Sequence, residues 1–253
     1  MTLYDSIILG IVEGITEFLP VSSTAHLVLT SSLLGIEQSA FTKAYEIMIQ
    51  IAPIFAVVII YFEKLFAGIE IWKKLIAAFI PTGIIGFLLS DFIESLFSGN
   101  YTVFWMIITG LAFIAIELIY KEKTHSITNI DKVSYKQAVT IGFIQALSLI
   151  PGISRSGSTI LGGMIIGLNR EVAMSFSFLL AIPTMSVASG YIFLKEYSTY
   201  SFDHIWLLLV GFVVSFLVGW VAVKSFLAIV SRFNFIPFGV YLLLSAGIFY
   251  ILT

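Results

Sequence analysis

The chain has no cysteine and few charged residues. None of its 253 residues is cysteine, and only 11% are Asp, Glu, Lys or Arg. The absence of cysteine excludes a disulfide framework, a thiolate metal site and a cysteine nucleophile. The scarcity of charge excludes an ordinary soluble domain, in which about a quarter of the residues are charged. A net charge of −2 does not indicate any class of partner.

Long hydrophobic runs fill the sequence instead. Hydrophobic residues make up 59% of the chain, and the mean hydropathy is +1.05. Runs of about 20 apolar residues are typical of helices that cross a bilayer. We therefore predict an all-α polytopic membrane protein that forms a single integral membrane domain over residues 1–253. The N-terminal run lacks a basic segment and contains Glu13 and Glu17, so we do not expect a cleaved signal peptide.

The two halves of the chain share a pattern at an offset of 132 residues. Each half has an apolar helix, a Pro/Gly/Ser break, a short apolar helix and three long spans. The matched pairs are Gly10 and Gly142, Glu13 and Gln145, Thr16 and Ser148, Ser22 and Ser154, and Thr24 and Ser156. We predict an internal duplication, with repeats of about 1–120 and 132–253. Three spans per half is an odd number, so the second repeat should have inverted topology.

The short runs 25–36 and 158–168 cannot span a membrane. If each helix–break–helix segment crossed twice, Ser22-Ser23-Thr24 would lie at the inner surface and Ser154-Arg155-Ser156 at the outer one. If both segments are re-entrant helical hairpins, one enters from each side and the two tips converge. Irregular backbone at depth is tolerated where protein buries it or where it lines a watery cavity. We therefore favour one re-entrant hairpin plus three transmembrane helices in each half.

Basic residues predict the orientation in the membrane. Opposite the side that holds the 37–44 loop lie ten basic residues: Lys64, Lys73, Lys74, Lys121, Lys123, Lys132, Lys136, Arg170, Lys224 and Arg232. Only Lys43 and Lys195 share the side of that loop. The positive-inside rule makes the richer side cytoplasmic, so we expect both termini outside.

Two carboxylates lie inside the first apolar run. Glu13 and Glu17 are spaced i, i+4 and share one helix face. A charge at bilayer depth costs about 2.5–3.5 kcal/mol on insertion scales, so such residues are usually functional. The pair is typical of a divalent-metal site or an acid/base pair. The alternative is two glutamates that line a solvated funnel without a chemical role.

Hydroxyl groups and a histidine follow these carboxylates. In Pro20-Val-Ser-Ser-Thr-Ala-His26, the proline should end the first helix, and hydroxyls should cap the next one. His26 lies one turn after Ser23, where it could take a proton from the serine hydroxyl. The alternatives are plain N-capping by Ser22 and Thr24, and a structural role for His26.

The second break carries an arginine among small residues. Pro151-Gly-Ile-Ser-Arg-Ser-Gly-Ser-Thr159 is a loop that leads into a helix, where backbone N–H groups can approach phosphate oxygens. Arg155 supplies a forked donor that matches a phosphate. The spacing of a Walker loop is absent. The alternative is that Arg155 is a structural counter-ion of Glu13 or Glu17.

Three further polar residues are weaker candidates. Glu46 and Gln50 share a helix face near the outer end of a span, where they would either support the site or lie at the interface. Glu117 lies near the cytoplasmic end of its span, which predicts an interfacial anchor.

Residues 13–26 and 151–159 together resemble the two signature motifs of bacterial undecaprenyl pyrophosphate phosphatases, the bacitracin-resistance family. The first resembles the glutamate-rich motif with its trailing Ser-Ser and His, and the second the PGxSRSxxT motif. The similarity extends over essentially the whole chain. The KxxxxxxRP…PSGH…SRxxxxxHxxxD signature of the other class of lipid phosphatase is absent.

The resemblance implies a hydrolase that removes the terminal phosphate of undecaprenyl diphosphate and so regenerates the lipid carrier for peptidoglycan synthesis. It implies Mg²⁺ or Ca²⁺ as cofactor, and an active site on the outer side of the bacterial cytoplasmic membrane. The catalytic residues would be Glu17, Ser23, His26 and Arg155, the metal ligands Glu13 and Glu17, and the substrate-binding residues Ser22, Thr24, Ser154, Ser156 and Thr159.

We hypothesise that Ser23 is the nucleophile and His26 the general base, with attack by water or by His26 itself as open alternatives. Arg155, the loop N–H groups and the metal would neutralise the diphosphate. The expected partners are the polyprenyl diphosphate lipid and membrane lipids, with a homodimer as an option and no nucleic acid. The rival function is a secondary transporter or flippase of a polyprenyl phosphate, because inverted repeats and broken helices are typical of transporters.

Overall fold

The computed structural model describes residues 1–96, 99–120, 126–196, 201–230 and 234–252. In these ranges the chain forms helices and one isolated bridge between Ile127 and Leu168, which confirms the all-α prediction. The first half contains α1 (Leu3–Thr16), α2 (Ser23–Leu33), α3 (Ala40–Met48), η1 (Ile49–Ile51), α4 (Ala52–Ile60), α5 (Phe62–Phe66), α6 (Ile69–Leu88), α7 (Ser90–Ser95) and α8 (Gly99–Ile119). The second half contains η2 (Ile130–Lys132), α9 (Tyr135–Gln145), η3 (Ala146–Leu149), α10 (Arg155–Ile165), α11 (Arg170–Glu196), α12 (Phe202–Val230) and α13 (Ile236–Leu252).

Five helices in the described part of the chain are long and apolar enough to cross a membrane. They cover Ala40–Ile60, Ile69–Leu88, Tyr101–Ile119, Arg170–Lys195 and His204–Ala228. A sixth apolar helix, Ile236–Ile251, is shorter. The prediction of a multi-pass helical membrane protein is therefore confirmed.

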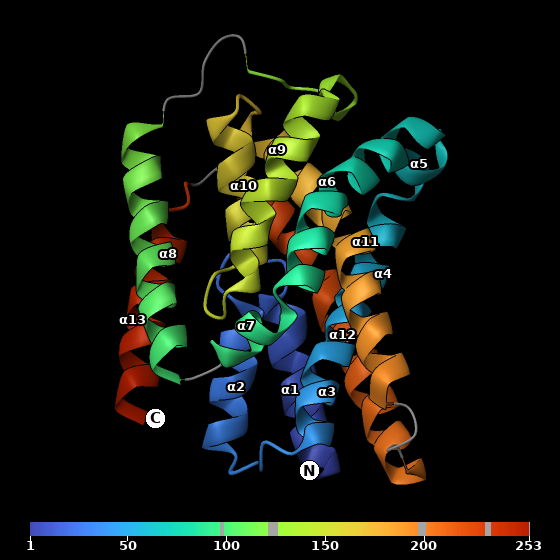
Figure 1. Cartoon of the computed structure of the whole chain (residues 1–253), viewed down its shortest axis with the longest axis vertical. Helices are drawn as coiled ribbons and strands as arrows, with labels where there is room; N and C mark the ends of the chain where they lie inside the picture. The colour runs from blue at the N-terminus through green and yellow to red at the C-terminus, as the bar shows by residue number, and fades with distance from the viewer. Residues whose placement is uncertain (97–98, 121–125, 197–200, 231–233, 253) are drawn as a thin grey trace.

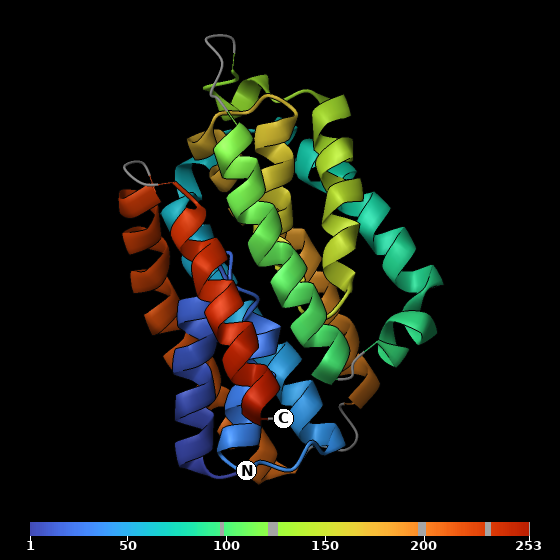
Figure 2. The same cartoon turned by 90° about the vertical axis from the view of Figure 1, so that its left-hand side faces the viewer.

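The helices α1, α2, α9 and α10 are each too short to cross a bilayer. Helix α1 has 14 residues, and α2, α9 and α10 have 11 each. At 1.5 Å per residue they are about 16 to 21 Å long, against a hydrocarbon core of about 30 Å. They form two hairpins, α1–α2 and α9–α10. In Figures 1 and 2 the first hairpin opens toward the bottom and the second toward the top, with their turns facing each other in the middle of the molecule.

Helix boundaries recur at the offset that the sequence suggested. Helix α2 covers residues 23–33 and α10 covers 155–165, a shift of 132 at both ends. Capping boxes open α1 at Thr2 and α9 at Ser134, again 132 apart. Both short helices end at a glycine with positive φ, Gly35 at 66° and Gly167 at 101°, as left-handed C-caps require. The two hairpins are therefore built from the same local signals.

Each hairpin packs closely against a span from the other half. A Cβ on Gly10 of α1 would lie 2.7 Å from the carbonyl oxygen of Gly211 on α12. A Cβ on Gly142 of α9 would lie 1.9 Å from the carbonyl oxygen of Ala78 on α6. Small residues permit this approach between helix backbones. The two halves consequently interlock, and each hairpin is fixed by the other half's helices.

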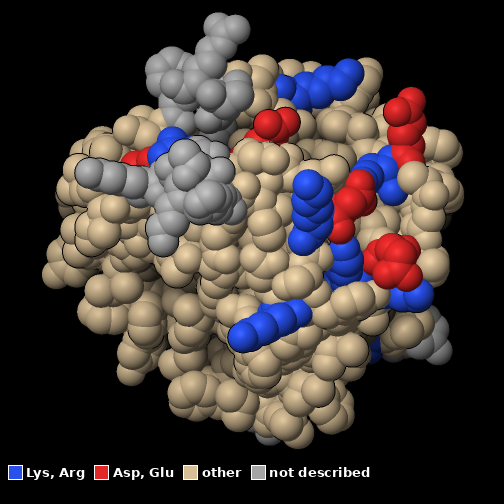
Figure 3. Space-filling model, turned by 90° about the horizontal axis from the view of Figure 1, so that it is seen from above, with Lys and Arg blue, Asp and Glu red and all other residues tan. Residues whose placement is uncertain are grey.

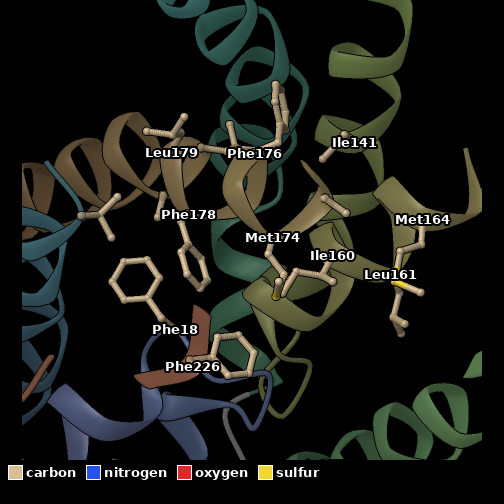
Figure 4. Close-up of a cluster of buried hydrophobic side chains, with 14 of the residues drawn as sticks. Phe18, Ile141, Ile160, Leu161, Met164, Met174, Phe176, Phe178, Leu179 and Phe226 are labelled. Carbon is tan, nitrogen blue, oxygen red and sulfur yellow. The ribbon is translucent and has the colours of Figure 1, made fainter. Parts of the chain in front are cut away.

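Aromatic side chains anchor the turn of the first hairpin in the core. Phe18 is fully buried and meets the ring of Phe178 edge-on, with ring centroids 4.9 Å apart. Phe226 of α12 lies 5.9 Å from Phe178 on its other side (Figure 4). Because Phe18 follows Glu17 directly, this packing also fixes the backbone beside that carboxylate.

Charged side chains gather on the upper face of the molecule (Figure 3). Lys64 pairs with Asp131, and the Lys74 ammonium donates to the backbone carbonyl of Asp131 at 2.7 Å. Lys73 pairs with Glu70 at 2.6 Å. Of the basic residues used to orient the chain, Lys121, Lys123 and Arg232 lie outside the described residues.

The prediction that Glu117 is an interfacial anchor is wrong. Glu117 is 8% exposed and forms an ion pair with Arg170. Its second oxygen accepts a hydrogen bond from the backbone N–H of Phe235 at 3.1 Å. The residue therefore joins α8 to α11 and to the start of α13, a role that only these tertiary partners could reveal.

Candidate active site

The two hairpin turns are joined by an ion pair and a hydrogen bond. The Arg155 Nη2 group donates to Glu17 Oε1 at 2.7 Å. The Ser156 hydroxyl donates to the backbone carbonyl of Leu19 at 3.0 Å. Arg155 also lies over the ring of Phe18, 5.4 Å from its centroid. The structure thus brings together the two polar motifs that lie 138 residues apart between Glu17 and Arg155.

Glu17 occupies the end of α1 and uses both of its carboxylate oxygens. Its Oε1 accepts from Arg155, and its Oε2 accepts from the Ser23 hydroxyl at 2.7 Å. Its side chain is 3% exposed. A carboxylate, a hydroxyl and a guanidinium therefore form one continuous buried network, in which the Ser23 proton already points at an acceptor.

Glu13 lies one turn earlier on α1 and is fully buried. Neither of its carboxylate oxygens has a hydrogen-bond partner among the described residues. An unpaired buried carboxylate is costly, so this side chain calls for a cation or a proton. The observation fits the predicted metal pair better than it fits a solvated funnel, because the side chain has no exposure.

A divalent cation at this pair would need further ligands. Within the described chain no group of three or more His, Cys, Asp and Glu side chains is arranged to hold a metal. Mg²⁺ is commonly held by one or two carboxylates together with substrate phosphates and water. The donor set of Glu13 and Glu17 therefore fits a cation that is bound jointly with a phosphate.

Arg155 keeps donors that are free for a ligand. It begins α10, and its side chain is 11% exposed. Nη1 donates to the backbone carbonyl of Ser177 at 3.2 Å, whereas Nε has no partner among the described residues. Arg155 is therefore a counter-ion of Glu17, as the alternative interpretation predicted. A guanidinium has five N–H donors, however, so this ion pair leaves several of them for a phosphate.

The hydroxyl groups of the second hairpin surround the start of α10. Ser154 is the N-cap and accepts from the Gly157 N–H at 3.1 Å, while its hydroxyl lies 3.2 Å from that of Ser156. The Thr159 hydroxyl lies 2.6 Å from the Ser177 hydroxyl of α11. The predicted small-residue loop does lead into a helix, but the helix already begins at Arg155, so residues 155–159 are helical. Ser177 is a neighbour that sequence reasoning missed, since it lies in an unremarkable part of a long span.

The first hairpin departs from the capping prediction. Ser22 is the N-cap of α2, but its side chain makes no capping hydrogen bond, and its backbone is left-handed with φ 65°. Thr24 is half-buried in the first turn of α2. The expected helix end at Pro20 comes earlier, because α1 ends at Thr16 and Pro20 lies in the turn.

His26 is oriented away from the partner that its spacing suggested. Its Nδ1 lies 2.9 Å from the backbone carbonyl of Ser22, and its Nε2 lies 2.8 Å from the Tyr241 hydroxyl. The hydroxyl of Ser23 is bonded to Glu17 instead. The neighbouring base of Ser23 in this conformation is therefore a carboxylate. Tyr241, on α13, is a second neighbour that the sequence analysis missed.

Glu46 and Gln50 are both buried. Glu46 accepts from the Ser31 hydroxyl at 2.6 Å and from the Gln38 amide at 3.3 Å. These bonds tie α3 to α2 and to the loop between them. Glu46 thus stabilises the open end of the first hairpin.

A family model described as "Bacitracin resistance protein BacA" matches residues 6–248 of this chain. An undecaprenyl-diphosphatase of Wolinella succinogenes is 52% identical over 249 residues, which cover 98% of this chain and 97% of that protein. One from Persephonella marina is 51% identical and covers 98% of both chains. One from Campylobacter hominis is 49% identical over 253 residues, again with 98% of both chains covered.

Proposed function

This chain belongs to the bacitracin resistance protein BacA family, and from that membership we propose that it hydrolyses undecaprenyl diphosphate to undecaprenyl phosphate and inorganic phosphate. The product is the lipid carrier for peptidoglycan and other envelope polymers, and its regeneration confers resistance to bacitracin. The observation that carries the proposal is the buried contact of Glu17 with both Ser23 and Arg155. Full-length similarity to proteins named undecaprenyl-diphosphatase supports the substrate.

Arg155 is proposed to bind the diphosphate. Its free Nε and its Nη groups would donate to phosphate oxygens, with Glu17 holding the guanidinium in place. Ser22, Thr24, Ser154, Ser156 and Thr159 are proposed to contact the phosphates through hydroxyl or backbone groups near the two helix N-termini. Phosphoryl transfer depends mostly on positioning and charge stabilisation, so this set supplies what the reaction needs.

Ser23 remains the proposed nucleophile, and Glu17 takes its proton in the conformation described here. The Ser23 oxygen would form a bond to the terminal phosphorus while the bond to the bridging oxygen breaks. Undecaprenyl phosphate then leaves with that electron pair. Water would next attack the phosphoserine and pass a proton toward His26 Nε2, while the bond from phosphorus to the Ser23 oxygen breaks. Inorganic phosphate then leaves, and the Ser23 oxygen regains the proton that Glu17 held. Direct attack by water or by His26 is the alternative that the Ser23 variant tests.

Glu13 and Glu17 are proposed to hold Mg²⁺ or Ca²⁺ together with the substrate phosphates. When bound, such a cation neutralises charge on the diphosphate and on the leaving phosphate. The unpartnered oxygens of Glu13 support this assignment. In the chain itself, Glu13 would then contribute binding and Glu17 both binding and proton transfer.

An inverted repeat with two re-entrant hairpins is proposed as the architecture. Three observations support it: the shared offset of 132, the shortness of the four hairpin helices, and the opposite directions in which the hairpins open in Figures 1 and 2. Both chain ends lie on the lower side, opposite the charged upper face of Figure 3. We accordingly assign the upper face to the cytoplasm of a bacterial cytoplasmic membrane and the site entrance to the outer side.

Phosphate release from undecaprenyl diphosphate by the purified chain tests the function. The wild type should release one phosphate per lipid, and EDTA should suppress the release. Ser23→Ala, His26→Ala and Glu17→Gln should each lose most activity. Ser158→Ala is the matched control, because that hydroxyl lies on α10 and, within the described residues, donates to the Ser154 carbonyl alone. A wild type that moves the lipid between leaflets without releasing phosphate would refute hydrolysis in favour of a flippase.

A further inference from the structure

The two ring nitrogens of His26 have different partners. Nδ1 faces the backbone carbonyl of Ser22 at 2.9 Å. A carbonyl oxygen only accepts, so Nδ1 carries the proton and the lone pair of the neutral ring is on Nε2. Nε2 lies 2.8 Å from the Tyr241 hydroxyl. The phenol donates to the neutral ring and accepts from the protonated ring, so it satisfies His26 in both states.

Backbone strain supports this arrangement. Ser22 is the one non-glycine residue with positive φ in the described part of the chain. A left-handed conformation is unfavourable for a serine and persists only where surrounding contacts hold it. The carbonyl of this residue is the one that holds Nδ1 of His26. The strained backbone therefore serves to fix the ring that Tyr241 approaches from the other side.

Tyr241 is held in place by the helix that carries it. Two residues earlier, a Cβ on Gly239 would lie 2.7 Å from the carbonyl oxygen of Gly110 on α8, so α13 is pressed against α8 at this level. The rings of Tyr241 and His26 are nearly parallel, at 7°. Tyr241 is 44% exposed and His26 is half-buried, so the pair lies at the edge of the polar cluster.

We propose that Tyr241 is a positioning residue for His26 in the phosphatase reaction. Its hydroxyl is bonded to Nε2 and so fixes the tautomer and the orientation of the ring, and a proton that His26 takes up and later returns crosses that bond. Tyr241 itself forms no bond to the substrate. The inference rests on the proposed hydrolase activity and goes beyond it, because Tyr241 lies outside both sequence motifs and on the last helix of the chain.

The kinetic test compares two tyrosines of the same helix. Tyr241→Phe removes the hydroxyl and keeps the ring, and we expect kcat to fall about three- to tenfold with little change in KM, as for the loss of one hydrogen bond. Tyr250→Phe is the matched control, because Tyr250 is 70% exposed on α13. In a His26→Gln background, Tyr241→Phe should cause no further loss. An unchanged kcat in Tyr241→Phe, or an equal further loss without His26, would overturn the proposal.

Nitrogen NMR of labelled histidine gives a readout that does not depend on activity. The chain has three histidines, so the His26 signals can be assigned with a His26→Gln sample. Tyr241→Phe should move the Nε2 resonance of His26 toward that of a free imidazole nitrogen, and Tyr250→Phe should not. An unmoved resonance refutes the contact. If the wild type releases no phosphate, the proposed function fails, and this spectrum alone then decides whether Tyr241 orients His26.

Discussion

The hairpins α1–α2 and α9–α10 share capping boxes, glycine C-caps and the bounds of their second helix, but they differ in chemistry. Position 13 is a glutamate in the first hairpin, and its equivalent at 145 is a glutamine. Position 23, the first residue of α2, is a serine, whereas Arg155 begins α10. One hairpin thus supplies carboxylates and a hydroxyl, and the other a guanidinium. The difference shows how two similar hairpins can each supply a different part of one polar cluster.

The buried residues Glu13 and Gln145 show the divergence most clearly. Both are completely buried. The Gln145 amide donates to the hydroxyls of Thr82 and Thr184, at 3.0 and 3.2 Å. The oxygens of Glu13 have no partner among the described residues. In the second hairpin this position is therefore satisfied by the protein, while in the first the proposed cation would satisfy it.

The largest effect is expected where the two hairpins meet. Arg155→Lys should lower kcat/KM about 100-fold or more, because an ammonium cannot reproduce the forked donor. Arg170→Lys, the same change at the Glu117 pair, should lower thermal stability and leave the rate per folded molecule unchanged. Phosphate release and thermal unfolding of both variants give the answer. A fully active lysine variant at position 155 would contradict the role of the guanidinium.

A smaller effect is expected for Glu13→Gln, which gives the first hairpin the residue that the second has at position 145. Wild-type protein should be stabilised by Mg²⁺ or Ca²⁺, by about 2.7 kcal/mol at a hundredfold excess over the dissociation constant. Glu13→Gln should abolish that stabilisation without lowering the stability of the metal-free protein. Thermal unfolding with and without the cation measures both. Retention of the full cation response in Glu13→Gln would exclude Glu13 as a ligand.

The reciprocal change should cost stability rather than activity. Gln145→Glu removes the amide that donates to Thr82 and Thr184, and should lower the free energy of unfolding by about 1–2 kcal/mol. The rate per folded molecule should stay near that of the wild type. Thermal unfolding and phosphate release measured on one preparation separate the two quantities. A loss of catalysis at full stability would place Gln145 in the site and break the comparison.

The smallest effect concerns the glycines that end α2 and α10. Gly35→Ala and Gly167→Ala should each cost about 1 kcal/mol, because both glycines have positive φ and a Cβ would meet no atom within 4 Å. The costs should be equal if the two caps are equivalent. Gly190→Ala, inside α11 and equally unobstructed, is the control and should not destabilise. Unequal costs in thermal unfolding would show that the caps differ.

Much of the fold could be predicted, because its signals are local. The offset between Gly10 and Gly142 and the shortness of the second helix of each hairpin were visible in the sequence. A helix does follow the loop motif, although it begins at Arg155, inside the predicted loop. The lengths of the hydrophobic runs predicted the membrane-spanning helices, although the last of these helices is shorter than the other five. These features depend on neighbours in the chain, which a sequence displays.

The partners within the site could not be predicted, because they depend on the conformation of the turn and on segments distant in the chain. Spacing suggested that His26 accepts a proton from Ser23. In the structure the Ser23 hydroxyl donates to Glu17 instead, and His26 is hydrogen-bonded to Tyr241. Tyr241 lies 215 residues from His26, and a tyrosine in an apolar helix is ordinary in a membrane protein. The capping prediction for Ser22 failed because its backbone is left-handed and its side chain makes no capping hydrogen bond. Of these departures from prediction, only the contact of His26 with Tyr241 joins the two halves of the chain.

A double-mutant cycle on Glu17 and Arg155, read as the free energy of unfolding, tests directly whether the two hairpins form one site. Glu17→Gln and Arg155→Gln each leave a buried partner unpaired, and the double variant leaves neither charge. The account predicts that the double variant loses less unfolding free energy than the two single variants lose together. The difference, the coupling energy, should be about 1–3 kcal/mol. Strict additivity would mean that Glu17 and Arg155 do not interact across the two hairpins, and would contradict the account.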